Sequence, residues 1–535
     1  MIKINALSFQ YPQSSHKVLD NVSLEIPPGT LTLVTGASGS GKSTLLRCIN
    51  GLVPHFSGGT ISGQIQVFGF DPIHEGVEVL ANIVSFVFQE PEAQFIFDVV
   101  EDEIAFSLEN LGVSRSEMGL RIDEVLHQLH LQDLRYRKIN HISGGEQQKV
   151  AIASALVTRP KVLILDEPTS QLDPTAADEV LKLILELRSQ LNLTVLISEH
   201  RLERLLPYVD RMINLTSSQT VTYGLPQDVL HSMVQVPPII EIAQKLGVSP
   251  LPLAPEAFPN LPAGKFPSVS SQSQRTPIEK PETLLSIQLL STSFGDQQIL
   301  KDITLDIHKG EILVMMGPNG AGKTTVLRSI LQMIPSSGNV IYRDVHLENM
   351  GFSEIIQHIA YLPQNPNDLL FAETIIDELK ITLKNHSRDI NKDNLCEFLG
   401  HFGLEDKGGR YPRDLSVGER QRTALAAITV HNPEIIFLDE PTRGLDYQAK
   451  KALSGLFQHW RKHRKAIIVV THDIEFAAQL ADRVAILERG KLVFSGSPIT
   501  AFTTFPAYQT QTARLFPGTG WIVPEDVVTD TDQNT

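Results

Sequence analysis

Short apolar runs alternate with longer stretches of helical spacing along the chain, and the whole pattern occurs twice. Residues 162–165 and 435–438 are continuous apolar runs that end in an acidic pair, and residues 194–198 and 466–471 are followed closely by histidine. Strands buried on both faces have such runs, so each half predicts a mostly parallel sheet flanked by helices. Ligands of these sheets bind beyond the carboxyl ends of the strands, where the polar residues fall.

A glycine-rich segment follows an apolar run in each half. Residues 36–44 and 317–325 both have the form G-x-x-x-x-G-K-[ST], and apolar residues 31–35 and 312–316 precede them. The glycines let backbone N–H groups curl around an anion, and the N-terminus of the next helix adds a favourable dipole. In this motif the lysine reaches the β- and γ-phosphates, and the hydroxyl after it holds Mg²⁺. We therefore predict that ATP is bound by Gly36, Ser38, Gly39, Gly41, Lys42, Ser43 and Thr44, and in the second half by Gly317, Asn319, Gly320, Gly322, Lys323, Thr324 and Thr325.

Landmarks of the first half recur in the second at a nearly constant offset, which indicates a duplicated domain. The pairs are Lys42 and Lys323, Gln89 and Gln364, Ser143 and Ser416, Asp166 and Asp439, and His200 and His472. Residues 246–256 and 515–525 share a Leu-to-Pro-Glu spacing, so we predict a C-terminal extension on each copy. The predicted organisation is a first domain over 1–258, a Pro- and Ser-rich linker over 259–283, and a second domain over 284–535 with a polar tail.

Bulk composition limits the class of protein. The chain has 535 residues, of which 42% are hydrophobic and 20% charged, which suits ordinary globular domains. Its net charge of -15 leaves no dominant basic footprint for nucleic acid. The two cysteines, Cys48 and Cys396, exclude a disulfide framework and fit a reducing compartment. The first residues predict a strand, and no apolar run approaches the length of a membrane span, so a membrane role would need a partner.

An acidic pair closes one apolar run in each half, Asp166-Glu167 and Asp439-Glu440. By itself, such a pair at a strand end is a weak signal. Downstream of a phosphate loop, however, the aspartate is expected to hold Mg²⁺, directly or through water. The glutamate is expected to orient or deprotonate the attacking water.

Two further segments, 142–148 and 415–421, precede these acids by the same spacing. Together with the phosphate loops and the Asp-Glu-Pro-Thr boxes, they resemble the signatures of ATP-binding-cassette (ABC) ATPases. Residues 170–173 and 443–446 are similar to the D-loops of that family, so the resemblance covers both halves. It implies that each signature serves the ATP of the opposite half across a pseudo-twofold, head-to-tail sandwich. The signature residues are Ser143, Gly145 and Glu146, and in the second half Ser416, Gly418 and Glu419.

The same resemblance implies three more pairs of site residues. Gln89 and Gln364 resemble Q-loop residues, which touch Mg²⁺ or water. His200 and His472 resemble the switch histidines that contact the γ-phosphate. Tyr11 and Phe294 take the place of the aromatic residue that stacks on adenine. Stacking needs only a π-face, so Phe can replace Tyr, and a plain core aromatic is the alternative at Phe294.

Two departures from the family pattern affect the signatures. Glu146 and Glu419 stand where glutamine is usual, and Val417 stands where glycine is usual. A β-branched residue at positive φ is strained, so we predict an ordinary helical φ for Val417. Both halves keep the lysine, the glutamate and the histidine, so we predict two hydrolytically competent sites.

Within the family the chain looks similar to the energy-coupling-factor (ECF) ATPases, which drive vitamin and transition-metal-ion uptake. The similar segments are 89–95, 100–112 and 198–203, with a looser counterpart over 364–379. This resemblance implies a peripheral ATPase at the cytoplasmic face of the cell membrane. It also implies two partners, a membrane-embedded scaffold (T-type) subunit and a small substrate-binding membrane subunit that selects the cargo.

One helical stretch predicts a surface for that scaffold. Ile104, Leu108 and Leu111 fall at i, i+4 and i+7, which forms one apolar helix face. We predict a docking groove there with an acidic rim that suits a coupling helix with a basic tip. The alternative is a solvated charged face. The rim residues are Asp98, Glu101, Asp102 and Glu103, and in the second copy Glu373, Asp377 and Glu378.

Several rival functions fit less well. The Gln-x-Pro region argues against the nearest rival, the ATPase of another ABC importer class such as a monosaccharide importer. A soluble tandem ATPase that works on ribosomes would have a long, charged, helical linker. A DNA-repair or chromosome ATPase would need a coiled-coil or zinc insertion, and a scaffold without hydrolysis would not need both glutamates. The sequence does not identify the transported substrate.

Overall fold

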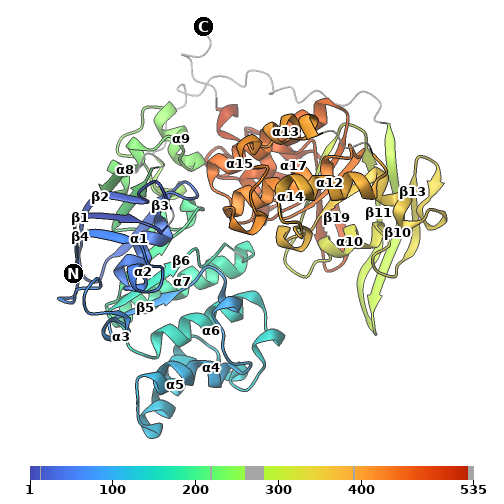
Figure 1. Cartoon of the computed structure of the whole chain (residues 1–535). Coiled ribbons are helices and arrows are strands. Elements are labelled where there is room, and N and C mark those ends of the chain that lie inside the picture. Colours follow the sequence, from blue (N-terminus) through green and yellow to red (C-terminus); the bar gives the residue numbers. More distant parts are fainter. Residues whose placement is uncertain (13, 171, 217–219, 259–281, 389–391, 528–535) are drawn as a thin grey trace. The chain divides into compact units, whose positions relative to one another are not determined.

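The computed structural model describes the whole chain except residues 13, 171, 217–219, 259–281, 389–391 and 528–535. Its internal contacts divide it into two compact units, Met1–Pro237 and Pro238–Thr535 (Figure 1). Most of the expected linker and the expected polar tail lie outside the described residues. No helix among the described residues is long and apolar enough to cross a membrane.

The first unit contains a six-stranded sheet in the order β5-β6-β7-β3-β8-β9. All neighbours in it are parallel except β8 and β9. A separate antiparallel sheet has the order β2-β1-β4. The strands are β1 (Ile2–Gln10), β2 (Leu19–Ile26), β3 (Leu31–Gly36), β4 (Thr60–Val67), β5 (Val84–Val87), β6 (Val162–Asp166), β7 (Thr194–Ser198), β8 (Arg211–Leu215) and β9 (Val221–Gly224). The helices are α1 (Lys42–Ile49), α2 (Leu52–His55), α3 (Val77–Leu80), α4 (Val100–Asn110), α5 (Arg115–Gln128), α6 (Gly144–Leu156), α7 (Pro174–Leu191) and α8 (Pro226–Ser232).

The second unit repeats this plan. Its six-stranded sheet has the order β15-β16-β17-β12-β18-β19, and its antiparallel sheet has the order β11-β10-β13-β14. The strands are β10 (Thr283–Phe294), β11 (Gln297–His308), β12 (Ile312–Met316), β13 (Ser337–Tyr342), β14 (Val345–His346), β15 (Ile359–Leu362), β16 (Ile435–Asp439), β17 (Ala466–Val470), β18 (Arg483–Glu488) and β19 (Lys491–Gly496). The helices are α9 (Pro238–Lys245), α10 (Lys323–Ile330), α11 (Phe352–His358), α12 (Ile375–Asn385), α13 (Lys392–Gly400), α14 (Val417–Thr429), α15 (Tyr447–Lys462), α16 (Ile474–Leu480), α17 (Pro498–Thr504) and α18 (Gln511–Leu515). The predicted α/β fold, with a mostly parallel sheet, an antiparallel sheet and helices in each copy, is confirmed.

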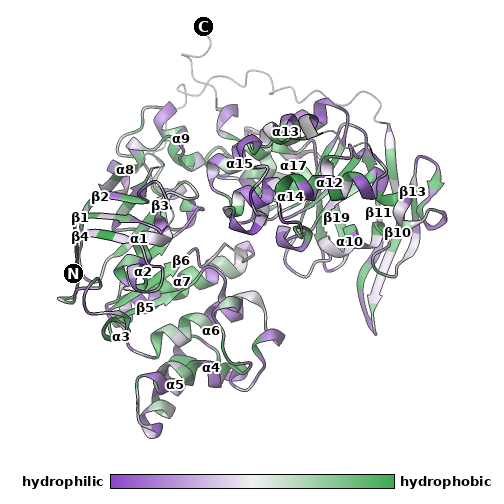
Figure 2. Ribbon diagram, in the orientation of Figure 1, coloured by the Kyte–Doolittle hydropathy of each residue, from purple (hydrophilic) through white to green (hydrophobic). Residues whose placement is uncertain are grey.

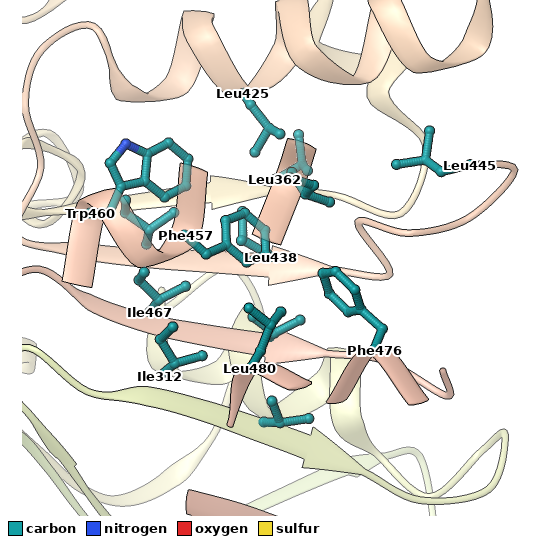
Figure 3. Close-up of a cluster of buried hydrophobic side chains, with 14 of the residues drawn as sticks. Ile312, Leu362, Leu425, Leu438, Leu445, Phe457, Trp460, Ile467, Phe476 and Leu480 are labelled. Atoms are coloured by element: carbon teal, nitrogen blue, oxygen red, sulfur yellow. The ribbon is translucent and has the colours of Figure 1, made fainter. Parts of the chain in front are cut away.

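The parallel sheets form the centre of each unit. Every residue of β6, β7, β12, β16 and β17 is buried, which explains why these strands are apolar without alternation. In Figure 2 helices such as α5 and α15 carry both hydrophobic and hydrophilic residues, as expected of helices that pack one face against such a sheet. In the second unit, strand residues such as Ile312 and Leu438 pack under Phe457 and Trp460 of α15 and Phe476 of α16 (Figure 3). Rigid strands therefore carry the polar residues at their carboxyl ends.

The C-terminal extensions pack together. In α9, the Ile239 backbone N–H donates to Oε1 of Gln511 at 3.1 Å. Nearby, the Phe258 and Phe516 rings meet edge to face at 6.2 Å, and Ile242 is buried in the same cluster. The segment 238–258, which the sequence assigns to the first copy, thus packs within the second unit.

Candidate functional site

Each phosphate loop connects the central strand of its sheet to the helix that follows. Strand β3 leads to α1, and strand β12 leads to α10. A Cβ on Gly36 would lie 2.1 Å from the carbonyl oxygen of Leu215, and one on Gly317 would lie 2.2 Å from that of Leu487. The loops therefore pass so close to the neighbouring strand that only glycine fits at these two positions.

Both loop lysines point into their own loops. The Lys42 Nζ donates to the carbonyls of the first two loop residues at 2.9 and 3.1 Å. The Lys323 Nζ makes the same two bonds at 2.8 and 3.0 Å. Both side chains are buried. A buried ammonium group beside the N-terminus of a helix is a suitable place for a polyphosphate, so these residues fit the predicted nucleotide.

The two candidate catalytic glutamates have a strained backbone. Glu167 has a φ of 50° and Glu440 a φ of 52°, both in the left-handed region. The Glu167 N–H donates to the carbonyl of Ser198 at 3.1 Å and to its Oγ at 2.9 Å. The Glu440 N–H donates to the carbonyl of Val470 at 2.8 Å. Such strain persists only where the surroundings fix it, and it often marks functional sites.

The switch histidines contact these glutamates directly. His200 Nε2 lies 2.8 Å from Glu167 Oε1, and His472 Nδ1 lies 2.8 Å from Glu440 Oε2. Both carboxyl groups are buried. In the first half Gln89 Nε2 also donates to Glu167 Oε2 at 2.7 Å. The structure thus brings together the three predicted residues of the first site and the glutamate and histidine of the second.

The residues predicted to hold Mg²⁺ differ between the halves. Thr324 Oγ1 donates to Asp439 Oδ2 at 2.7 Å, whereas Asp166 Oδ1 accepts from Ser198 Oγ at 2.6 Å. Burial raises the pKa of Asp439 to about 6, and Glu440 adds to the shift while the Thr324 hydroxyl opposes it. A hydroxyl and a carboxylate beside one another are hard oxygen ligands of the kind that Mg²⁺ takes. The residues of the second half therefore fit this ion.

Each signature segment begins a helix with a capping box. Ser143 caps α6, and its N–H and Oγ each donate to Glu146 Oε2 at 2.7 Å. Ser416 caps α14, and its N–H donates to Glu419 Oε2 at 2.9 Å. Both serines are exposed. The glutamates that depart from the family pattern are thus explained locally, because a Ser-x-x-Glu pair satisfies two free N–H groups at a helix start.

Val417 occupies the first turn of α14 and is not among the residues with positive φ, as predicted. Its counterpart Gly144 also has no positive φ, and a Cβ there would lie 3.8 Å from Leu172. That distance is an ordinary contact, so the position has room for a side chain. The next glycine is tighter, because a Cβ on Gly145 would lie 3.2 Å from Ala176.

The two aromatic residues proposed for adenine are placed differently. Tyr11 is half-buried, and its Oη lies 3.1 Å from Thr44 Oγ1 in the first turn of α1. Its ring meets Phe9 edge to face at 4.8 Å. Phe294 ends β10 and is 55% exposed, so the core-aromatic interpretation of this residue is wrong.

The prediction that the apolar face of α4 is exposed for docking is wrong, because this face points into the domain. Ile104 and Leu108 are fully buried, so this face packs against the domain itself. Glu103 is buried too, and its Oε2 accepts from the N–H groups of Ile96 and Phe97 at 2.8 and 2.9 Å. In the second half Glu378 is buried in the same way, and its Oε2 accepts from the N–H groups of residues 371 and 372. The two glutamates therefore hold the preceding loop and do not belong to a rim.

The exposed apolar residues lie on that preceding loop. Ile96 and Phe97 are exposed, and Phe97 packs on Phe106 with ring centroids 5.5 Å apart. A groove of about 300 Å³ opens beside them, lined by β5, α4 and the end of α6. Phe371 is the exposed counterpart in the second half. Asp98, Asp102 and Glu373 remain exposed near these residues in sequence, whereas Glu101 pairs with Arg135 and Asp377 with Lys380.

One buried acid near the site received no role from the sequence. Glu199 stands directly before His200 and accepts hydrogen bonds from Thr169. The sequence signal for a role was the position of this acid between a buried strand and the switch histidine. The role itself depends on a contact with Thr169, 30 residues away, which the sequence does not reveal.

Comparisons with known proteins assign the chain to a family. The family model described as "ABC transporter" matches residues 19–170 and 300–443. A Streptomyces coelicolor protein assigned as an ABC transporter ATP-binding protein is 35% identical, over 98% of this chain and 99% of the relative. YkoD of Bacillus subtilis, assigned as an HMP/thiamine import ATP-binding protein, is 32% identical over 94% of this chain and 92% of YkoD.

A solved structure agrees with the tandem fold. An archaeal ribosome recycling factor, aABCE1, in complex with ribosomal stalk protein aP1, matches with a TM-score of 0.59. The match covers 92% of this chain and 90% of that one, at 23% identity. At that identity the likeness concerns the fold alone.

Proposed function

Because the chain belongs to the ABC transporter family and carries an ABC ATPase domain in each half, we propose that it is the energy-coupling ATPase of an ECF-type importer. Its cargo would be a vitamin or a transition-metal ion. The observation that carries the ATPase part of this proposal is the buried glutamate–histidine pair that both halves keep at 2.8 Å. Similarity to YkoD along nearly its whole length supports the importer class.

In the proposed reaction, each half binds one ATP on its phosphate loop, and the signature of the other half completes the site. Lys42 and Lys323 would neutralise charge on the β- and γ-phosphates. The exposed serines Ser143 and Ser416, at the starts of their helices, would donate to the γ-phosphate of the opposite site. ATP then favours the closed state because its γ-phosphate contacts both halves only in that state.

Hydrolysis would rest on the two strained glutamates. Glu167 and Glu440 orient the attacking water and accept its proton, while His200 and His472 hold each carboxylate in place. When bound, Mg²⁺ would supply positive charge next to the phosphates. The residues that would hold it are Ser43, Gln89 and Asp166, and in the second half Thr324, Gln364 and Asp439.

The membrane partner would dock on the loop that the buried glutamates hold. In the first half, Ile96 and Phe97 present an exposed apolar edge beside the 300 Å³ groove. Phe371 would play that part in the second half. An apolar helix with a basic tip suits this edge, because Asp98 and Asp102 lie close by in sequence. Docking there would place the ATPase at the cytoplasmic face of the membrane.

Co-purification tests the proposal most simply. We expect the tagged chain, extracted in detergent, to retain a polytopic scaffold and a small substrate-binding membrane protein. Ile96→Asp combined with Phe371→Asp should release the scaffold but leave ATP hydrolysis intact. Ile499→Asp, at another exposed isoleucine away from this loop, is the control and should retain it. Recovery of only a sugar-importer permease or of ribosomes would reject the ECF assignment.

A further inference from the structure

Glu199 is a buried carboxyl group that the proposed reaction does not use. The residue is 2% exposed at the end of β7. Its Oε1 accepts hydrogen bonds from the backbone N–H of Thr169 at 3.0 Å and from Thr169 Oγ1 at 2.6 Å. Its Oε2 accepts a weaker bond from the backbone N–H of His200 at 3.2 Å. One carboxylate thus links two loops at the edge of the sheet.

Both loops carry residues of the ATP site. Thr169 follows Glu167 by two residues, and the Ser170 N–H donates to the Glu167 carbonyl at 3.2 Å in the same turn. His200 contacts the Glu167 carboxyl group. The contacts form a closed circuit from Glu167 to Thr169, to Glu199, to His200 and back to Glu167. Any shift of one loop must therefore be followed by the other.

The second half has only a long hydroxyl contact in place of this carboxylate link. Thr471 takes the place of Glu199, and its Oγ1 lies 3.4 Å from the Oγ1 of Thr442, the counterpart of Thr169. The same hydroxyl accepts from the Asp473 N–H at 3.1 Å. Asp473 caps α16 and pairs with Lys450 at 2.7 Å. The second switch histidine is therefore positioned from a helix start, whereas the first is positioned by a carboxylate.

Keeping a carboxyl group buried at position 199 costs folding free energy. Burial raises the pKa of the Glu199 carboxyl group, and the nearby Glu167 adds to the shift. Threonine serves the same position in the second half, so folding of the domain does not by itself require a carboxylate. A costly buried polar group that closes a circuit around a strained residue points to positioning.

We propose that Glu199 is a positioning residue that ties His200 to the turn after Glu167, so that the first ATP site depends on a carboxylate link that the second replaces with one long hydroxyl contact. The proposal deepens the proposed function and rests on ATP hydrolysis by these glutamates. It does not require any particular membrane partner. Glu199 would act through the placement of Glu167 relative to water and would make no contact with nucleotide.

Two substitutions in the full chain test the proposal. Glu199→Thr installs the residue of the second half and removes the carboxylate, so that at most the long hydroxyl contact of the second half can form. Glu199→Gln keeps the shape and the acceptor for Thr169, but turns an NH₂ group toward the His200 N–H. Misplacement of a catalytic group by about 1 Å can cost about a hundredfold in rate. In a Glu440→Gln background, where only the first site hydrolyses ATP, we expect Glu199→Thr to lower kcat at least tenfold, with KM for ATP within twofold, and Glu199→Gln to give an intermediate kcat.

The matched control is Thr471→Ser, which keeps the hydroxyl at the equivalent position and should leave kcat within twofold. Nucleotide affinity without turnover, measured in EDTA with a fluorescent ATP analogue, should be unchanged in all three variants. The proposal is overturned if, in the Glu440→Gln background, kcat of the Glu199 variants stays within twofold of the Glu440→Gln parent. It is equally overturned if ATP affinity falls in parallel with kcat.

Should Glu199→Thr fail to fold, the nearly isosteric Glu199→Gln decides between these outcomes. Failure of the proposed function has a different signature. It would appear in the wild-type chain, as absence of the expected membrane partners with ATP hydrolysis unaffected. The two proposals can therefore fail separately.

Discussion

The two halves share their phosphate chemistry but not the contacts that support it. Both keep a lysine folded into its loop, a glutamate with φ near 50° and a histidine 2.8 Å from that glutamate. Around this constant set, Asp166 accepts from a serine of the neighbouring strand, whereas Asp439 accepts from the phosphate-loop Thr324. Duplication has thus preserved the groups predicted to contact ATP, while the residues that hydrogen-bond to them have changed.

The surfaces near α4 and α12 differ as well. In the first half Leu111 and Thr158 line the groove beside the Ile96–Phe97 edge. Their counterparts in the second half are His386 and His431, whose rings stack 3.8 Å apart. The comparison teaches that equal ATP motifs do not imply equal surfaces for a partner.

The largest expected effect falls on the constant set. Glu167→Gln combined with Glu440→Gln removes both general bases, which should lower ATP turnover by about 10²- to 10⁴-fold. ATP binding should survive, because neither residue belongs to the phosphate loops. Steady-state hydrolysis and nucleotide binding are the measurements. Normal hydrolysis by the double variant would show that the glutamates are not catalytic.

The next largest effect concerns the phosphate-loop glycines, and the loss of stability should be equal in the two halves. Gly36→Ala and Gly317→Ala each force a Cβ to about 2 Å from a backbone oxygen, at an expected cost of roughly 3–5 kcal/mol. Gly39→Ala and Gly320→Ala are matched controls, because a Cβ there meets nothing within 4 Å and only positive φ strains them. Their cost should be about 1 kcal/mol. Denaturant unfolding measures both, and equal losses for test and control would contradict this explanation.

The stability of the second half should depend on pH through a buried histidine that the first half does not have at that position. Burial lowers the pKa of His431 to about 3. The nearby His386 makes the next largest contribution, and Lys465 and Arg388 add to the shift. Below the ordinary histidine pKa of 6.5, the unfolded second half takes up a proton that the folded one refuses. His431 therefore contributes a loss of stability as pH drops from 6.5 towards 3, by up to about 1.4 kcal/mol per pH unit, and the raised pKa of Asp439 opposes this loss below about pH 6.

Both tryptophans, Trp460 and Trp521, lie in the second unit, so their fluorescence follows that unit alone. Unfolding curves at pH 7 and pH 5 should differ for wild type. His431→Thr, which installs the first-half residue, should flatten this dependence, although it also lowers stability at neutral pH. An unchanged pH dependence in that variant would remove His431 as its cause.

The smallest effect should come from the irregular signature. Val417→Gly and Gly144→Val exchange the two signatures at a position where φ is helical and a Cβ has room. We expect hydrolysis within about twofold of wild type, because the propensity cost of glycine in a first turn is below about 1 kcal/mol. A tenfold change in turnover would mean that Val417 makes the two sites unequal.

Much of this site is predictable from local sequence. A phosphate loop, an acidic pair after a buried strand and a Ser-x-x-Glu cap each lie within a few residues, so spacing alone identifies them. The helical φ of Val417 followed from the cost of a β-branched residue at positive φ. Contacts over long separations are not encoded in this way. Glu199 gains its meaning from Thr169, and Thr324 from Asp439, only after folding.

The docking face shows the limit of periodicity. Ile104 and Leu108 have the spacing of one helix face, but the spacing does not say whether that face looks to the core or to a partner. Glu103 and Glu378 likewise read as surface acids, although each is buried and holds two backbone N–H groups. The exposed edge at Ile96 and Phe97 lay in a loop, where no period exists to detect it.

A distance between the halves tests most directly whether each half completes the ATP site of the other. One pair of spin labels is placed at the exposed residues His141, near Ser143, and Asp296, near the predicted adenine residue Phe294. The matching pair is placed at the exposed residues Asp414, near Ser416, and Ser15, near Tyr11. Cys396, the exposed native cysteine, would be replaced by serine. In the Glu167→Gln, Glu440→Gln variant, ATP with Mg²⁺ should shorten both distances and narrow their distributions. Distances that stay long and unchanged with and without nucleotide, for both pairs, would contradict the shared sites.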